Sequence, residues 1–222
     1  MEKGFSHFDA IVYINLSHRK DREKLLLEEL QRCQIDFDKL IRIEGVHDIL
    51  NGHRGCAKSH KKALQIAKDN MWSNVLILED DVIFIEDVAL VSSSIDHFFN
   101  NLKNDWDVFF LAANVFSASK TKDDRIKRVL SAQCAHAYAV NQSYFDALIE
   151  CFSQSIEEMK EDLDFSDSLL KAIDQRWKLL QPFDRWYITD VLGQQRRSYS
   201  DIEHKIKDRK HLDFTFFENQ SF

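Results

Sequence analysis

An apolar run that ends in three consecutive acids is the feature that most constrains this chain. Residues 75–78 are Val, Leu, Ile and Leu, and Glu79, Asp80 and Asp81 follow directly. The apolar run predicts a buried strand, so the acids stand at its carboxyl end. In open α/β sheets, ligands bind in the crevice outside the carboxyl ends of the strands. For the triplet taken alone, a solvated acidic turn is the simpler interpretation.

Three adjacent carboxylates also raise the question of charge compensation. They repel one another, and a bound cation removes that cost. Carboxylate oxygens suit the hard cations Mg²⁺ and Mn²⁺, which in turn bind diphosphates. The sequence therefore indicates Mn²⁺ or Mg²⁺ as a cofactor.

The size and composition of the chain indicate one globular domain over residues 1–222. Hydrophobic residues make up 44% and charged residues 30% of the 222 positions, and there is one proline. These values are ordinary for a folded domain and leave no proline-rich linker. The net charge of −7 argues against a general nucleic-acid binder.

Targeting and redox signals point to the cytoplasm. Residues 1–9 lack the apolar core of a signal peptide, and no apolar run approaches the ~20 residues that cross a bilayer. The four cysteines are scattered without metal-ligand spacing: Cys33, Cys56, Cys134 and Cys151. We expect four reduced thiols in a cytoplasmic protein without a transmembrane segment.

Strand and helix patterns alternate along the chain. Strands are expected over residues 9–16, 40–46, 75–78, 106–112 and 136–140, and near Lys178 and Tyr187. Helices are expected over residues 17–33, 56–71, 87–102, 142–152 and 164–173, with Asp87 and Asn141 as caps and a glycine-dense loop at 51–55. This alternation predicts an α/β fold with a mainly parallel sheet and helices on both faces.

One basic segment stands out in an otherwise acidic chain. Residues 117–128 are polar and include five basic side chains: Lys120, Lys122, Arg125, Lys127 and Arg128. We expect a mobile loop that recruits an anionic acceptor or closes over a bound ligand, with a merely solvated loop as the alternative.

Four segments of the chain form an ordered set of motifs. They are Ile14-Asn15-Leu16 with Arg19-Lys20-Asp21-Arg22; Gly55-Cys56-Ala57-Lys58-Ser59-His60; Leu76-Ile77-Leu78-Glu79-Asp80-Asp81-Val82; and Ser198-Tyr199-Ser200-Asp201-Ile202-Glu203. Together they resemble glycosyltransferase family 25, which includes bacterial lipopolysaccharide sugar transferases and collagen galactosyltransferases. The resemblance spans about residues 9–203.

This resemblance implies a metal-dependent, GT-A-like enzyme. The donor would be a nucleotide diphosphate sugar, with UDP-galactose or UDP-glucose as the first choice, and the acceptor a glycan or a protein hydroxyl. A cation held by Glu79 and Asp81 would stabilise the charge that develops on the leaving phosphate. Asp80 would orient the donor and is one of two expected catalytic residues.

The first two motifs supply the expected donor-binding residues, which are Asn15, Leu16, Arg19, Arg22, Gly55, Ser59 and His60, together with Asp80. Backbone amides and arginines at a helix start can bind phosphate, and a glycine lets the backbone approach a ligand. The alternatives are a solvated basic first turn around Arg19 and Arg22, and a core histidine at His60. Cys56 is interpreted as a packed thiol rather than a nucleophile.

Two further site residues come from the last third of the chain. Asp167 matches a later aspartate of the family and is the expected general base for the acceptor hydroxyl; a helix-start acid is the alternative. His204, beside Asp201, is the expected third metal ligand, with a charged surface helix as the alternative. Gln194 or Gln195 matches a family glutamine.

Two other classes of function compete with glycosyl transfer. A non-catalytic sugar- or partner-binding module would be expected to lose the acids, yet all three are present. A metal-dependent phosphohydrolase would need further histidine or aspartate ligands at several strand ends, and the sequence does not place them.

Overall fold

The computed structural model describes residues 4–160, 168–202 and 205–207. A six-stranded sheet forms its centre, in the order β2 (Leu40–Glu44), β1 (Ala10–Asn15), β3 (Asn74–Glu79), β6 (Lys127–Asn141), β5 (Val108–Lys120) and β7 (Trp186–Ile188). Five of the strands run in one direction and β6 runs against them. The mainly parallel sheet predicted from the sequence is confirmed.

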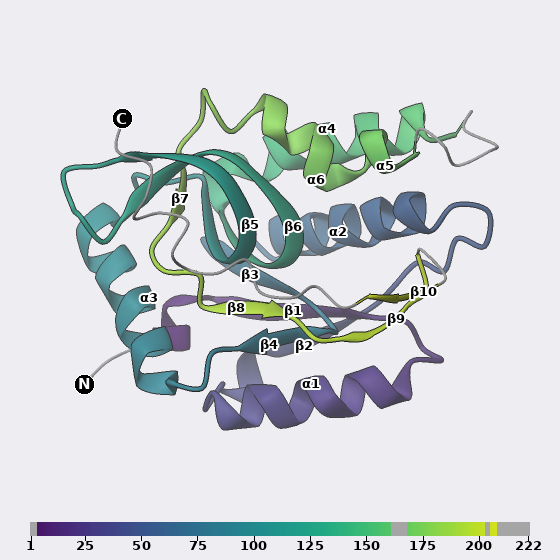
Figure 1. Ribbon diagram of the computed structural model, residues 1–222, viewed down its shortest axis with the longest axis horizontal. Coiled ribbons are helices and arrows are strands. Elements are labelled where there is room, and N and C mark those ends of the chain that lie inside the picture. Colours follow the sequence, from purple (N-terminus) through teal and green to yellow (C-terminus); the bar gives the residue numbers. More distant parts are fainter. Residues whose placement is uncertain (1–3, 161–167, 203–204, 208–222) are drawn as a thin grey trace.

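Helices cover both faces of this sheet (Figure 1). The longer helices are α1 (Lys20–Arg32), α2 (Gly52–Asp69), α3 (Val88–Leu102) and α4 (Phe145–Glu158), and the short ones are α5 (Ser168–Lys171) and α6 (Ile173–Arg176). Side chains of α2 and α4 pack into one apolar core and those of α1 and α3 into a second. The short 3₁₀ helices are η1 (Gly4–His7), η2 (Phe37–Lys39), η3 (Gln142–Tyr144) and η4 (Trp177–Leu179).

Strand β3 explains why the apolar run carries no polar residue. Val75 and Ile77 point into the core beneath α2 and α4, whereas Leu76 and Leu78 point into the core beneath α1 and α3. All four side chains are completely buried. A strand buried on both faces needs apolar residues at every position rather than at alternate ones.

Two small ribbons complete the fold. Strand β4 (Val82–Phe84) pairs with β8 (Gly193–Gln195), and β9 (Ser198–Ser200) pairs with β10 (Lys205–Lys207), both antiparallel. Because β4 follows β3 after a two-residue turn, its partner β8 brings the last part of the chain beside the acidic triplet.

Both predicted helix caps are confirmed. The Asp87 carboxylate accepts a hydrogen bond from the amide of Leu90 at the start of α3. The Asn141 side chain accepts from the amide of Ser143 at the start of η3, which leads into α4.

The prediction of a loop at residues 51–55 is wrong, because α2 begins at Gly52. The Asn51 side chain accepts a hydrogen bond from the amide of Arg54 and caps the helix. Gly55 lies against the preceding segment: a Cβ there would stand 2.5 Å from the carbonyl oxygen of Val46. Close packing, rather than loop formation, accounts for this glycine.

The expected loop at residues 117–128 is mostly strand. Lys120 of β5 pairs with Lys127 of β6, so a long hairpin leaves only residues 121–126 as its turn. The Thr121 hydroxyl donates within that turn, and Asp123 contacts His97 of α3 at 2.7 Å. Exposed polar strands lack the apolar alternation that distinguishes strands from loops, which explains the error.

Two elements near the carboxyl end also differ from expectation. The strand near Tyr187 is confirmed as β7, but Lys178 lies in the 3₁₀ helix η4 instead of a strand. Trp177 is completely buried there, and its indole N–H donates to the carbonyl of Ala132 at 3.1 Å. The helix expected over residues 164–173 falls partly outside the described residues, and α5 and α6 are separated by Ala172 in an extended conformation.

The Gly55 contact yields a stability prediction with a definite sign. Alanine normally stabilises a helix interior by about 0.5–1 kcal/mol over glycine. At this position Gly55→Ala should instead destabilise the fold by about 1–3 kcal/mol, because the new methyl group overlaps the Val46 carbonyl. Urea denaturation measures the change. Gln65→Ala, on the exposed side of the same helix, is the control, and a Gly55→Ala protein as stable as the parent would contradict the packing argument.

Candidate active site

The three acids lie at a tight turn at the carboxyl edge of the sheet. Glu79 is the last residue of β3, and Asp80 and Asp81 form the turn into β4. The carbonyl oxygen of Asp81 accepts from the amide of Arg196, just beyond β8. A three-residue run is thereby fixed between two strands whose positions the sheet and the β4–β8 ribbon determine.

Arg22 bridges two of these acids. From the first turn of α1, one guanidinium nitrogen donates to Asp80 Oδ1 and the other to Asp81 Oδ2, each at 2.6 Å. The second nitrogen also donates to the Ser198 hydroxyl of β9 at 2.7 Å. The Arg22 side chain is 14% exposed and each aspartate 7%. The guanidinium is thus a nearly buried counter-ion for two carboxylates.

Asn15 fixes Asp80 from the other side. At the end of β1, its amide nitrogen donates to Asp80 Oδ2 at 2.9 Å and to the carbonyl of Arg19 at 3.0 Å. Arg42 donates to the Asn15 side-chain oxygen at 3.2 Å. Both carboxylate oxygens of Asp80 therefore have protein partners.

Asp81 differs from Asp80 in having one uncommitted oxygen. Its Oδ2 accepts from Arg22 and from the Gln195 side chain, the latter at 3.0 Å. Its Oδ1 is buried without a hydrogen-bond partner among the described residues, and the same holds for Gln195 Oε1. A buried oxygen without a donor is costly unless a ligand binds it.

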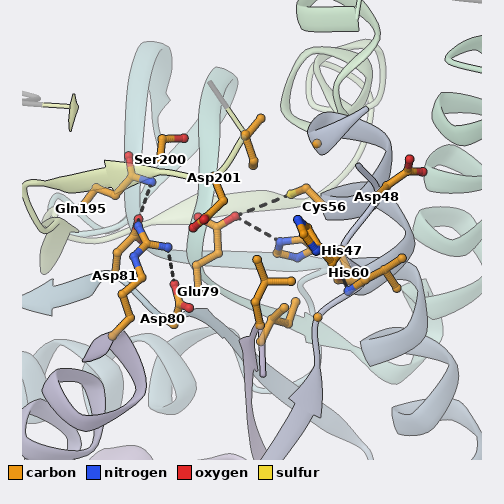
Figure 2. Close-up of a pocket in the computed structure, with 18 residues that line it drawn as sticks. His47, Asp48, Cys56, His60, Glu79, Asp80, Asp81, Gln195, Ser200 and Asp201 are labelled. Carbon is orange, nitrogen blue, oxygen red and sulfur yellow. Dashed lines mark hydrogen bonds and ion pairs between the residues drawn. The ribbon is translucent and has the colours of Figure 1, made fainter. Parts of the chain in front are cut away.

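Glu79 contacts α2 instead of Arg22. Its Oε1 lies 3.3 Å from His60 Nε2 and 3.8 Å from Cys56 Sγ (Figure 2). The other ring nitrogen of His60 lies 2.9 Å from the Tyr138 hydroxyl of β6. Glu79 thus points to α2, whereas Asp80 and Asp81 share the Arg22 guanidinium.

The ionisation of the acids differs accordingly. Burial is the main cause that raises the pKa of Asp81 to about 7; Arg22 opposes the shift, while Glu79 and Asp80 add to it. Burial likewise raises the pKa of Asp80. Burial is the largest influence on Glu79 too, but the hydrogen bond to His60 together with the charges of His60, His136 and Arg22 outweighs it and lowers the pKa to about 2. Glu79 is therefore the acid most strongly held in its ionised form.

A pocket opens beside the turn, between the carboxyl edge of the sheet and the start of α2 (Figure 2). The residues that line it include seven of those predicted from the sequence: Leu16, Arg22, Ser59, His60, Glu79, Asp80 and Asp81. Segments near both ends of the chain, β1 and β9, meet at this pocket.

Comparison with protein families identifies the chain. The profile of glycosyltransferase family 25, described as a lipopolysaccharide biosynthesis protein, matches residues 3–165. This chain belongs to glycosyltransferase family 25. It is therefore a glycosyltransferase, and its family implies a nucleotide-sugar donor and an acceptor. No curated protein matches the chain.

Solved structures resemble this glycosyltransferase in fold. UDP-glucose pyrophosphorylase complexed with UDP-glucose matches with a TM-score of 0.50 and 6% identity, over 84% of this chain and 92% of that one. A glycosyltransferase involved in the glycosylation of the major capsid of PBCV-1 matches with a TM-score of 0.47 and 13% identity, over 82% of each chain. A197 from STIV matches with a TM-score of 0.44 and 13% identity, over 91% and 98%. The predicted α/β, GT-A-like fold class is confirmed.

Three predicted donor-binding residues of this family 25 enzyme do not line the pocket. Asn15 is 1% exposed and holds Asp80. Arg19 pairs with Asp21 and with Asp201, and the latter does line the pocket. The close approach that Gly55 allows is to the protein's own residues 46–48. In this arrangement the three residues position the pocket wall.

Ser59 lines the pocket but is also committed to the backbone. Its hydroxyl donates to the carbonyl of Gly55 and accepts from the amide of Val46, each at 2.8 Å. These two bonds tie the loop after β2 to the first turns of α2.

Asp167 and His204 lie outside the described residues, so the predicted general base and third metal ligand stay predictions. Asp201, the described neighbour of His204, lines the pocket and lies 3.6 Å from His18.

Other pocket residues were not identified as functional from the sequence. His47 lines the pocket and its ring lies 5.0 Å from that of His18, while Asp48 anchors Arg54 and Lys58. For Gln195, the sequence indicated a match to a family glutamine but no role. No spacing pattern identifies these residues, because the loop after β2 and the β8 strand reach the pocket through tertiary contacts alone.

The residues present fit a hard divalent cation at one position. The bare Oδ1 of Asp81 is a buried carboxylate oxygen of the kind that Mg²⁺ and Mn²⁺ bind.

Among the described residues, none of the helices is both long and apolar enough to cross a membrane.

The bridging role of Arg22 predicts a large stability effect. Arg22→Met keeps the length of the side chain but leaves two nearly buried carboxylates without their counter-ion, so the free energy of unfolding should fall by about 3–5 kcal/mol. Chemical denaturation at neutral pH measures it. Lys68→Gln is the control: it removes an ion pair whose partners are 49% and 75% exposed and should change stability by less than about 0.5 kcal/mol. Equal losses in the two variants would contradict the assigned role of Arg22.

Proposed function

We propose that this enzyme transfers a hexose from a nucleotide diphosphate donor, with UDP-galactose or UDP-glucose as first candidates, to a hydroxyl of a glycan or protein acceptor. We further propose that transfer requires Mn²⁺ or Mg²⁺. The observation that carries the proposal is the acidic turn at the mouth of the pocket, where Asp81 keeps one buried oxygen without a hydrogen-bond partner among the described residues.

The donor would bind with its diphosphate near the acidic turn. Two of the predicted groups are suited to it: the guanidinium of Arg22, whose buried Nε has no partner among the described residues, and the carboxylate of Asp81. The first can donate to a phosphate oxygen and the second can hold the cation. When bound, the cation would stabilise the negative charge that develops on the leaving phosphate.

The other acids would support this arrangement. The Asp80 carboxylate accepts hydrogen bonds from Arg22 and Asn15 and so fixes the guanidinium beside the pocket. Glu79 lies on the opposite side of the turn, against His60 of α2, where its negative charge faces the same pocket. Asp167 would accept the proton of the acceptor hydroxyl, and His204 would complete the cation ligands.

Binding of the nucleotide tests the metal dependence. Calorimetry with UDP should show tighter binding in the presence of Mn²⁺ than after thorough chelation, because the cation links the diphosphate to Asp81. Asp81→Asn keeps the shape and the bond to Gln195 but removes the charge, so it should abolish the effect of Mn²⁺. Asp146→Asn, an exposed acid of α4, is the control. Equal UDP affinity with and without Mn²⁺ would remove the proposed role of the cation.

Turnover tests the acid–base assignment. A sugar hydroxyl is a weak nucleophile at neutral pH, and a positioned base is worth ~10²–10⁴-fold in rate. Asp167→Asn should lower kcat by that factor while UDP and Mn²⁺ still bind with parent affinity. Release of UDP from UDP-galactose and UDP-glucose, followed with a glycan acceptor, measures the rate. A parent-like kcat would assign the base elsewhere, with Asp164, three residues before Asp167, and Asp201 as the next candidates.

A further inference from the structure

Three different ligand types meet at one side of the pocket. Cys56 and His60 stand one turn apart on α2, and Glu79 ends β3 (Figure 2). The sulfur, the imidazole nitrogen and a carboxylate oxygen all lie within 4.8 Å of one another. The sequence gives no sign of this group, because a single Cys-x-x-x-His pair on a helix completes no ligand set without the distant glutamate.

Two of the three distances between these atoms come close to those around a tetrahedral ion. Zinc bonds of about 2.3 Å to sulfur and about 2.0–2.2 Å to nitrogen and oxygen place neighbouring ligand atoms roughly 3.3–3.6 Å apart. Glu79 Oε1 lies 3.3 Å from His60 Nε2 and 3.8 Å from Cys56 Sγ. Small side-chain adjustments would suffice for all three atoms to reach one ion.

The histidine is already oriented for coordination. Tyr138 lies 2.9 Å from Nδ1, and its ring stacks on the imidazole at 5.7 Å. Phe152 packs edge-on against the same ring. Without an ion, Nε2–H donates to Glu79; when an ion binds, Nε2 gives up this proton to solvent and Nδ1–H donates to the Tyr138 oxygen, so that the Nε2 lone pair faces the ion. Metal-binding histidines commonly have such a contact on the second nitrogen, which fixes the ring.

The ligand chemistry separates this group from the acidic turn. A thiolate with an imidazole favours zinc and cobalt, whereas oxygen ligands alone favour magnesium, manganese and calcium. Asp81 offers only oxygen, and its side chain contacts Arg22 and Gln195 rather than α2. Three protein ligands also leave one tetrahedral position open, the count found in catalytic zinc sites.

We propose that Cys56, His60 and Glu79 form a binding site for a zinc-class divalent ion in the wall of the pocket, distinct from the hard-cation position at Asp81. The thiol of Cys56 loses its proton to solvent when the sulfur coordinates. All three ligands line the pocket, so the ion is reached from the side on which substrates enter.

Cobalt provides an optical test on the whole chain. Chelator-treated protein kept in a phosphine reductant is titrated with Co²⁺. Thiolate-to-cobalt charge transfer and the intense visible bands of four-coordinate cobalt should appear, saturate at one ion per chain, and disappear on adding Zn²⁺ but not excess Mg²⁺. Absence of these bands, or their persistence in the presence of Zn²⁺, would overturn the proposal.

Matched variants assign the bands to this group. Cys56→Ser should remove the charge-transfer band, and Glu79→Gln should weaken Co²⁺ binding. Cys33→Ser should leave both unchanged. Cys33 also lies near a carboxylate, 4.0 Å from Glu29, but it belongs to no three-ligand group among the described residues. Tyr138→Phe should keep the band but lower affinity roughly 10–100-fold.

The outcomes remain decisive if a variant is unstable. Thermal melts in chelator establish that each variant is folded before titration. A charge-transfer band that survives in folded Cys56→Ser protein, or that vanishes in Cys33→Ser protein, would contradict the assignment. The titration uses no sugar donor, so its result does not depend on whether the enzyme transfers a hexose as proposed.

Discussion

The pocket depends on the ion pairs that the Arg22 guanidinium forms with Asp80 and Asp81. The guanidinium joins three segments that are far apart in the sequence: the first turn of α1, the turn after β3, and Ser198 of β9. Two carboxylates at 7% exposure need a buried counter-ion, and only arginine offers two parallel donors in one plane. A cation in the first turn of a helix is unfavourable for the helix dipole, so the two acids must supply the compensation.

Part of this arrangement could be predicted from the sequence because it depends on local rules. Residues 75–78 are apolar at every position, as a strand covered on both faces requires. Asp87 and Asn141 precede helices and cap them through their own side chains. The acids after the strand indicated the edge of the sheet at which the pocket opens, and the ordered motifs indicated the family.

The rest depends on contacts that no local pattern encodes. Gly55 resembles a loop residue in sequence, yet its lack of a side chain serves the contact with residues 46–48. The long β5–β6 hairpin extends beyond the apolar core, so its polar strands look like a loop. Gln195 reaches Asp81 only because β8 pairs with β4. Each of these features is set by chain segments that meet only in the folded protein.

The direction of each acid then decides how the triplet can work. Glu79 belongs to a strand and its side chain follows the pleat toward α2, whereas Asp80 and Asp81 belong to a turn and point to Arg22 from adjacent positions. The three neighbouring carboxylates therefore do not share one set of partners. Glu79 shares its surroundings with sulfur and imidazole, and Asp81 shares its own with amide and guanidinium groups. A single acidic run can in this way present soft and hard ligand environments to the same pocket, because the change from strand to turn separates its side chains.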